Sequence, residues 1–281
     1  MSATERMVTI LLAGTALIVF LFVSAPTELP DGKSEQASPE ATVPVAKVLA
    51  ILAAENDVAR SLYTSQIVGA GKAVGLQFSE HWQDASIEAG PLPALFLRST
   101  AAEVFAVTPD LGLFLGSEYP IAASNLFSDS QMQQFRKVAE NGEAVMFPDA
   151  GANAFTAMYP DYASVQACVT CHNEHPDSPK NDWKLQDIMG ATTWTYPRDR
   201  VSAAEALQLI RSLRNGFIQT YTRYVEKARG FSRAPQIGDK WPSGGDYCLP
   251  APEEFAAEFE RRAALATSTA LLELVEARGE E

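Results

Sequence analysis

The chain has 281 residues, of which 47% are hydrophobic and 20% charged, a composition typical of a globular protein with one large or two small domains. Its formal net charge of −13 argues against nucleic acid as a partner, because the phosphate backbone attracts basic proteins. Three cysteines are too few for a disulfide framework in a chain of this length.

The N-terminus begins with an apolar run. Residues 7–23 carry no charge, and at about 1.5 Å per residue they cross most of a roughly 30 Å hydrocarbon core. A cleaved signal peptide is the alternative, because Val23-Ser24-Ala25 resembles a cleavage site, although Pro26 disfavours cleavage there. Residues 1–25 therefore predict an anchor (or signal peptide) for a single-pass protein of the cytoplasmic (inner) membrane, with its soluble domain in the periplasm.

The next segments predict a spacer followed by a mixed domain. Residues 26–42 are rich in Pro, Ser and acidic side chains, which is typical of a flexible linker. Apolar spacing predicts helices over 43–75, 92–105 and 130–141, the last ended by Gly142. Short β-rich runs predict strands over 111–117, 143–148, 154–160 and 190–197. This order predicts an α+β domain with an antiparallel sheet.

The C-terminal part, residues 199–281, predicts a helical extension. Ser202 and Glu205 form a capping-box pattern, and Gly230 ends the helix that follows. Its apolar positions fall at three- and four-residue steps: Leu207, Ile210, Leu213, Phe217, Tyr221 and Tyr224. They predict core packing or pairing with a last helix that begins at Pro252, and a homodimer interface is the alternative. Little regular structure is expected between these two helices.

The most informative segment is ACVTCHNEHP, residues 167–176, which uses two of the three cysteines and two of the three histidines. Cys168, Cys171 and His172 have the spacing of a c-type haem attachment site, in which two thiols bond the vinyl groups and the histidine reaches the iron. With these residue types so rare, the chance of this spacing is on the order of 10⁻⁴. Export across the membrane agrees with this interpretation.

Three alternatives to a haem stay open. A zinc site needs four ligands, and one CxxC pair with His172 and His175 would be unusually cramped. A thioredoxin-like redox pair normally follows a strand in a βαβ fold, which the pattern here does not predict. A structural disulfide across two residues would be strained.

The segment from Cys168 to Pro197, with LYTSQIVGAGKAVGL, PLPALFLRSTAAEV and LGLFLGSEYPI upstream, resembles the Tll0287-like haem family over about residues 45–198. The resemblance implies a PAS-like α+β fold over residues 43–198, with an antiparallel sheet flanked by helices and one covalently attached haem c outside the cytoplasmic membrane. It makes Cys168 and Cys171 the thioether residues and His172 the proximal iron ligand. Because relatives often carry signalling modules, it also implies a sensory role, but residues 199–281 are too short for such a module.

The second axial ligand of the iron is open. Some relatives supply a cysteine from the N-terminal helix, and this helix has none. His81 and Met158 are the candidates, and an open or water-occupied position is the alternative; Met146, Met189 and Cys248 are weaker choices. His175 and Arg98 are expected in the haem environment, and Arg60 and Lys72 could also neutralise propionates.

Two functions remain. The first is a membrane-anchored module that senses redox state or a small ligand and acts through a protein partner. The second is a tethered c-type cytochrome for electron transfer. Aside from the haem motif, the sequence has no phosphate loop, catalytic triad order or second metal-ligand cluster, so we expect binding or electron transfer and no enzymatic activity.

Overall fold

The structure is a computed structural model that describes residues 42–276, which belong to one compact unit, Thr42–Glu281. The predicted membrane segment and most of the spacer lie outside the described residues. Among the helices that are described, none is both long and apolar enough to cross a bilayer. A four-stranded antiparallel sheet with packed helices confirms the α+β expectation.

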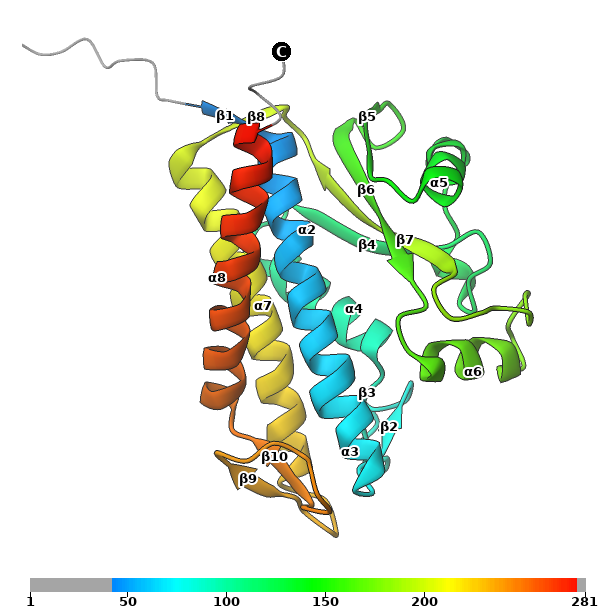
Figure 1. The fold of residues 1–281 in the computed structure, drawn as a ribbon, viewed down its shortest axis with the longest axis vertical. Helices are drawn as coiled ribbons and strands as arrows, with labels where there is room; N and C mark the ends of the chain where they lie inside the picture. Colours follow the sequence, from blue (N-terminus) through cyan, green and yellow to red (C-terminus); the bar gives the residue numbers. More distant parts are fainter. Residues whose placement is uncertain (1–41, 277–281) are drawn as a thin grey trace, which may run out of the picture. The chain divides into compact units, whose positions relative to one another are not determined.

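The elements follow one another in mixed order (Figure 1). The helical segments are α2 (Val45–Leu62), the π-helix η1 (Tyr63–Gly69), α3 (Ala70–Ala73), α4 (Pro93–Val107), the 3₁₀ turn η2 (Ala123–Asn125), α5 (Asp129–Asn141), α6 (Gln166–Glu174), α7 (Ala203–Ala228) and α8 (Pro252–Glu276). The strands are β1 (Thr42–Pro44), β2 (Phe78–Ser79), β3 (Gly90–Pro91), β4 (Gly112–Gly116), β5 (Val145–Asp149), β6 (Ala154–Tyr162), β7 (Ile188–Tyr196), β8 (Arg200–Ser202), β9 (Gln236–Gly238) and β10 (Cys248–Pro250).

The helix ends follow local sequence rules. Helix α5 begins with a complete capping box between Ser128 and Gln131 and ends at Gly142, whose φ of 71° is the left-handed conformation that glycine adopts without strain. Helix α7 keeps half of its predicted box, because the Ser202 hydroxyl accepts a hydrogen bond from the Glu205 amide at 3.2 Å. The Glu205 carboxylate instead bonds Arg198 and the Tyr196 hydroxyl.

The main sheet has the strand order β4-β7-β6-β5, with every neighbouring pair antiparallel. Helices α2 and α4 pack on one face of this sheet, and α5 packs on the other (Figure 1). Strand residues alternate between the two faces, so Ala157 and Trp194 join the larger core while Met158 joins a small cluster beneath α5. This sheet carries the chain from β6 directly into α6.

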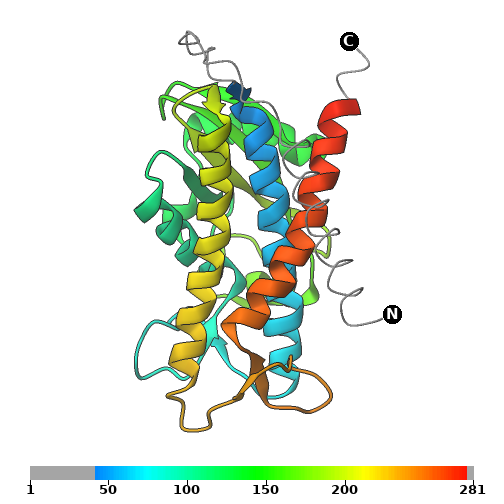
Figure 2. The same cartoon turned by 90° about the vertical axis from the view of Figure 1, so that its left-hand side faces the viewer.

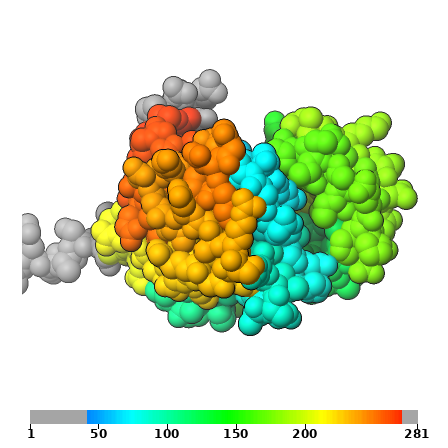
Figure 3. Space-filling model, turned by 90° about the horizontal axis from the view of Figure 1, so that it is seen from below, coloured from blue at the N-terminus to red at the C-terminus, as the bar shows by residue number. Residues whose placement is uncertain are grey.

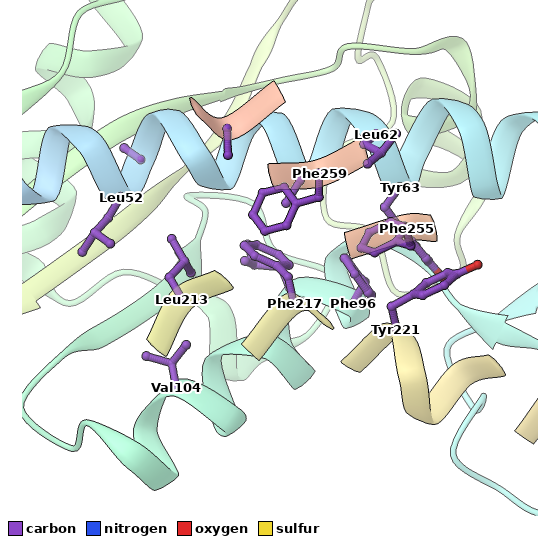
Figure 4. Close-up of a cluster of buried hydrophobic side chains, with 14 of the residues drawn as sticks. Leu52, Leu62, Tyr63, Phe96, Val104, Leu213, Phe217, Tyr221, Phe255 and Phe259 are labelled. Atoms are coloured by element: carbon purple, nitrogen blue, oxygen red, sulfur yellow. The ribbon is translucent and has the colours of Figure 1, made fainter. Parts of the chain in front are cut away.

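The larger core contains a group of aromatic side chains that pack against one another and against aliphatic residues of α2, α4, α7 and α8 (Figure 4). Phe96 of α4 stacks on Tyr63 at 3.9 Å between ring centroids and meets Phe217 of α7 at 5.6 Å. Phe255 of α8 meets the same ring edge-on at 6.3 Å. Burying each such ring stabilises the fold by roughly 1.5–3 kcal/mol. The helices α2, α4, α7 and α8 therefore share one core.

The two C-terminal helices lie alongside α2 (Figure 2). The predicted core packing of the α7 apolar positions is confirmed for four of them, which are fully buried: Leu213, Phe217, Tyr221 and Tyr224. Leu207 is 54% exposed. A polar contact also joins the three helices, because the fully buried Glu55 of α2 accepts hydrogen bonds from Arg214 of α7 at 2.7 and 2.5 Å and from Thr267 of α8 at 2.5 Å.

Candidate functional site

The haem motif lies on a short helix, α6, for which the sequence predicted no secondary structure. Cys168, Cys171 and His172 occupy positions i, i+3 and i+4, which share one face of a helix. Val169 points to a different side and is buried in a small cluster with Ala163, Trp183 and Met189. Cys168 also packs against this cluster, so helix α6 is attached through Val169 and Cys168 and leaves Cys171 exposed.

Hydrogen bonds reinforce this attachment. The Asn173 amide group donates to the Trp183 carbonyl at 3.0 Å and accepts from the Trp183 backbone N–H at 2.9 Å. Trp183 is itself held by Tyr119, which packs edge-on at 6.2 Å, and by the Lys180 ammonium, 4.7 Å from the ring centre. These contacts fix the segment after α6 against the helix, and so orient the motif.

The three motif side chains are chemically available. Both Cys168 and Cys171 are free thiols, the first half-buried and the second exposed. His172 is half-buried, and burial lowers the pKa of its imidazole, which favours the neutral form that binds metal ions. Its Nδ1 atom is buried and has no hydrogen-bond partner among the described residues.

Opposite α6, helix α2 and strand β6 contribute four polar side chains. Arg60 of α2 bonds Asp161 of β6, with Nη1 to Oδ1 at 2.5 Å, and it lies close enough to Cys168 for their charges to interact. The buried hydroxyl of Tyr159 lies near Asp57. Solvent reaches the Asp57 carboxyl, but protein surrounds it on most sides and raises its pKa to about 6.

We call the region between these four polar side chains and the motif of α6 the recess. Figure 3 shows a hollow between the cyan surface of the α3 region and the green surface that includes α6. The carboxylate of Glu80 lies 3.7 Å from the Nε2 atoms of both His81 and His175, and so links the segment after β2 to the end of α6. Partial burial raises the pKa of the Cys171 thiol. The charge of Lys72 lowers this pKa and the charge of Glu80 raises it, so both side chains lie near the thiol.

The structure brings some of the predicted residues to this recess and not others. His175 ends α6, and its Nδ1 accepts a hydrogen bond from the Asp177 amide at 3.2 Å. The side chain of His81 is 76% exposed. Met158 is fully buried beneath α5, in a different cluster from the motif. Arg98, on α4, donates a hydrogen bond to the Asn125 side chain at 2.7 Å. Cys248 is buried in β10.

Sequence reasoning missed Asp57, Tyr159 and Asp161, and it treated Arg60 only as one of several basic residues that could meet a propionate. Asp57 and Arg60 stand three residues apart on one helix, which was the one available local signal. Asp161 lies 101 residues from Arg60, so their pairing leaves no local pattern.

The described side chains hold no group of three or more His, Cys, Asp or Glu residues arranged to bind a metal ion, so no preformed protein-only metal centre accompanies the motif. Cys168 and Cys171 are free thiols, so they do not form the structural disulfide considered above. The arrangement is instead two thiols and a neutral imidazole at the edge of a recess.

Comparison with known proteins gives one match. Residues 71–197 match the sequence model of the Tll0287-like family, described as Tll0287, which confirms the resemblance carried by the motif and its flanking segments. Neither the curated proteins nor the solved structures include one that matches the chain. The matched range contains α4, α5, α6 and the whole main sheet, but it excludes α2, α7 and α8.

Proposed function

Residues 71–197 form a Tll0287-like domain, and on this basis we propose that the chain is a monohaem c-type protein in which Cys168, Cys171 and His172 hold the haem. The observation that carries the proposal is the common face of these residues on α6, beside a recess lined from α2 and β6. The four-stranded antiparallel sheet with helices on both faces supports a PAS-like fold for this domain.

The residues present suit such a group. Covalent haem c requires two free thiols and one imidazole, and all three are available on α6. The lowered pKa of His172 supports ligation because a neutral imidazole is the form that binds iron. When bound, the haem would supply an iron that changes oxidation state and accepts ligands.

We place this haem domain outside the cytoplasm, tethered through the apolar residues 7–23, with a sensory role exercised through a protein partner. The recess supports sensing, since protein surrounds the polar groups of Arg60, Asp57 and Tyr159 beside the motif. A tethered electron carrier is the second candidate. It is favoured by the exposure of Cys171, because an attachment residue at the surface would bring one edge of the haem close to a redox partner.

The test is a set of visible absorption spectra of the protein produced with a c-type haem assembly system: oxidised, reduced with dithionite, and reduced under CO. We expect haem bands, and a haem that stays with the polypeptide after denaturation and acid extraction. A CO-induced shift of the Soret band would favour the sensor. Sharp α and β bands that CO leaves unchanged would favour the electron carrier.

Matched cysteine variants make the test specific. Cys168→Ala combined with Cys171→Ala should abolish covalent retention of the haem. Cys248→Ala should not affect it, because Cys248 lies in β10 and outside the motif. If the wild-type protein acquires no haem under these conditions, the proposal is wrong.

A further inference from the structure

The recess contains two buried hydrogen-bond donors that lack an acceptor. The Arg60 side chain is only 18% exposed, and its Nη1 bonds Asp161, but its Nε–H has no partner in the described part of the chain. The Tyr159 hydroxyl is buried and likewise without a partner there. A buried donor left unpaired costs free energy, so native proteins nearly always supply an acceptor.

Both donors belong to the walls that face the haem motif. Arg60 extends from α2, and its charge interacts with Cys168 of α6. The Asp161 carboxylate that holds Arg60 also acts on His172. Tyr159 precedes Asp161 by two residues on β6, so both side chains leave the same face of the strand. An acceptor placed between these walls would therefore lie next to a group held by Cys168 and His172.

The surrounding charges restrict the chemistry of that acceptor. Arg60 has two carboxylates near it, Asp161 on β6, to which it is hydrogen-bonded, and Asp57 on its own helix. Since Asp161 already pairs with the guanidinium, a further anion would meet an excess of negative charge. A neutral acceptor, small enough to fit beside the haem, suits the site better.

We infer that Arg60 and Tyr159 hold a small neutral diatomic ligand, of the class of O₂, NO and CO, bound to the iron of the proposed haem. The inference rests on the proposed haem site and deepens it by naming the class of ligand and the residues that hold it. Arg60 and Tyr159 donate the hydrogen bonds, and Asp161 positions the guanidinium.

The test compares Arg60→Met and Tyr159→Phe with the wild-type protein as ferrous CO complexes. Loss of a donor should raise the C–O stretching frequency, because a hydrogen bond to the ligand favours electron donation from the iron. It should also speed CO dissociation, by about tenfold for one hydrogen bond. Arg223→Met is the matched control, since it breaks an exposed ion pair with Glu103 between α7 and α4 and should change neither value.

The possible results separate the two proposals. Wild-type protein without haem contradicts the proposed function, and this inference falls with it. A protein that contains haem but binds neither CO nor NO in its ferrous state overturns the inference alone. The inference is also overturned if Tyr159→Phe and Arg60→Met both keep the C–O frequency and the CO dissociation rate of the wild-type protein. Tyr159→Phe removes a single oxygen atom and decides the question even if Arg60→Met fails to fold.

Discussion

Asp57 is an acidic side chain that protein surrounds on most sides although solvent reaches it, and its pKa is raised from 3.8 to about 6, chiefly by burial. Arg60 opposes this rise and Asp161 adds to it. A carboxyl with a raised folded-state pKa favours the folded state most at low pH, where it is protonated in both states. That contribution is lost as the pH rises from about 4 to about 6, because the unfolded chain releases the proton first.

We therefore predict that Asp57→Asn becomes progressively more stable than the wild type between pH 4 and pH 6, with a constant difference above that range. The gain should be on the order of 1 kcal/mol, since solvent screens part of the charge. Urea unfolding of both proteins at a series of pH values measures it, and the values near pH 4 serve as the internal control. A difference that stays flat, or that shrinks as the pH rises, would contradict the assignment.

The same recess shows what residue spacing can and cannot reveal. Cys168, Cys171 and His172 were found from sequence because their chemistry requires fixed separations along the chain. Asp57, Tyr159 and Asp161 were not, because they meet the motif only through the packing of α2, β6 and α6. A wall formed by residues about a hundred positions apart has no signature in local periodicity.

At the scale of elements, the sequence located those with strong local signals. Helices α4 and α5 begin and end within two residues of their predicted bounds, because Pro93 and the Ser128 box mark their starts and Gly142 ends the second. Helix α6 gave no such signal. It is short, buries only Val169, and its N-cap residue, Val165, makes no capping hydrogen bond. Its helical form depends on the tertiary contacts of Trp183 and Asn173.

Strand β7 depends on a glycine at a close approach between strands. A Cβ atom at Gly190 would lie 2.2 Å from the backbone oxygen of Gly116 in β4, far inside van der Waals contact. Gly190 is also paired with Asp161 of β6, next to an irregularity in the register. The absence of a side chain there lets β4 pair closely with β7.

We predict that Gly190→Ala destabilises the protein by at least about 1–3 kcal/mol, because neither backbone can yield without disrupting the sheet. Gly238→Ala is the matched control: it lies at the end of β9 with no atom within 4 Å of the added Cβ, and its effect should stay within about 0.5 kcal/mol. Chemical denaturation of both variants measures the difference. Equal stability of the two would show that the β4–β7 contact is looser than described.

At the scale of the whole molecule, the family match and the physical core have different bounds. The match ends at residue 197, but α7 and α8 supply rings that pack directly on Phe96 of α4. Glu55 of α2 is fully buried and is compensated by Arg214 and Thr267, both beyond the matched range. Removing the partners of a buried charge is strongly destabilising, because the charge stays desolvated without compensation.

We therefore predict that a chain ending at residue 198 does not fold cooperatively, whereas residues 42–281 do, since they form one compact unit. Truncation would expose Leu49, Leu52 and Phe96, which are fully buried and whose burial stabilises the fold by roughly 1.5–3 kcal/mol each. It would also leave the Glu55 carboxylate without its hydrogen-bond partners. Together these losses consume most of a typical stability of about 5–15 kcal/mol. Circular dichroism and urea unfolding of the two chains test this. A sharp, reversible transition in the shorter chain would show that the matched domain is stable alone and that α7 and α8 are an appendage to it.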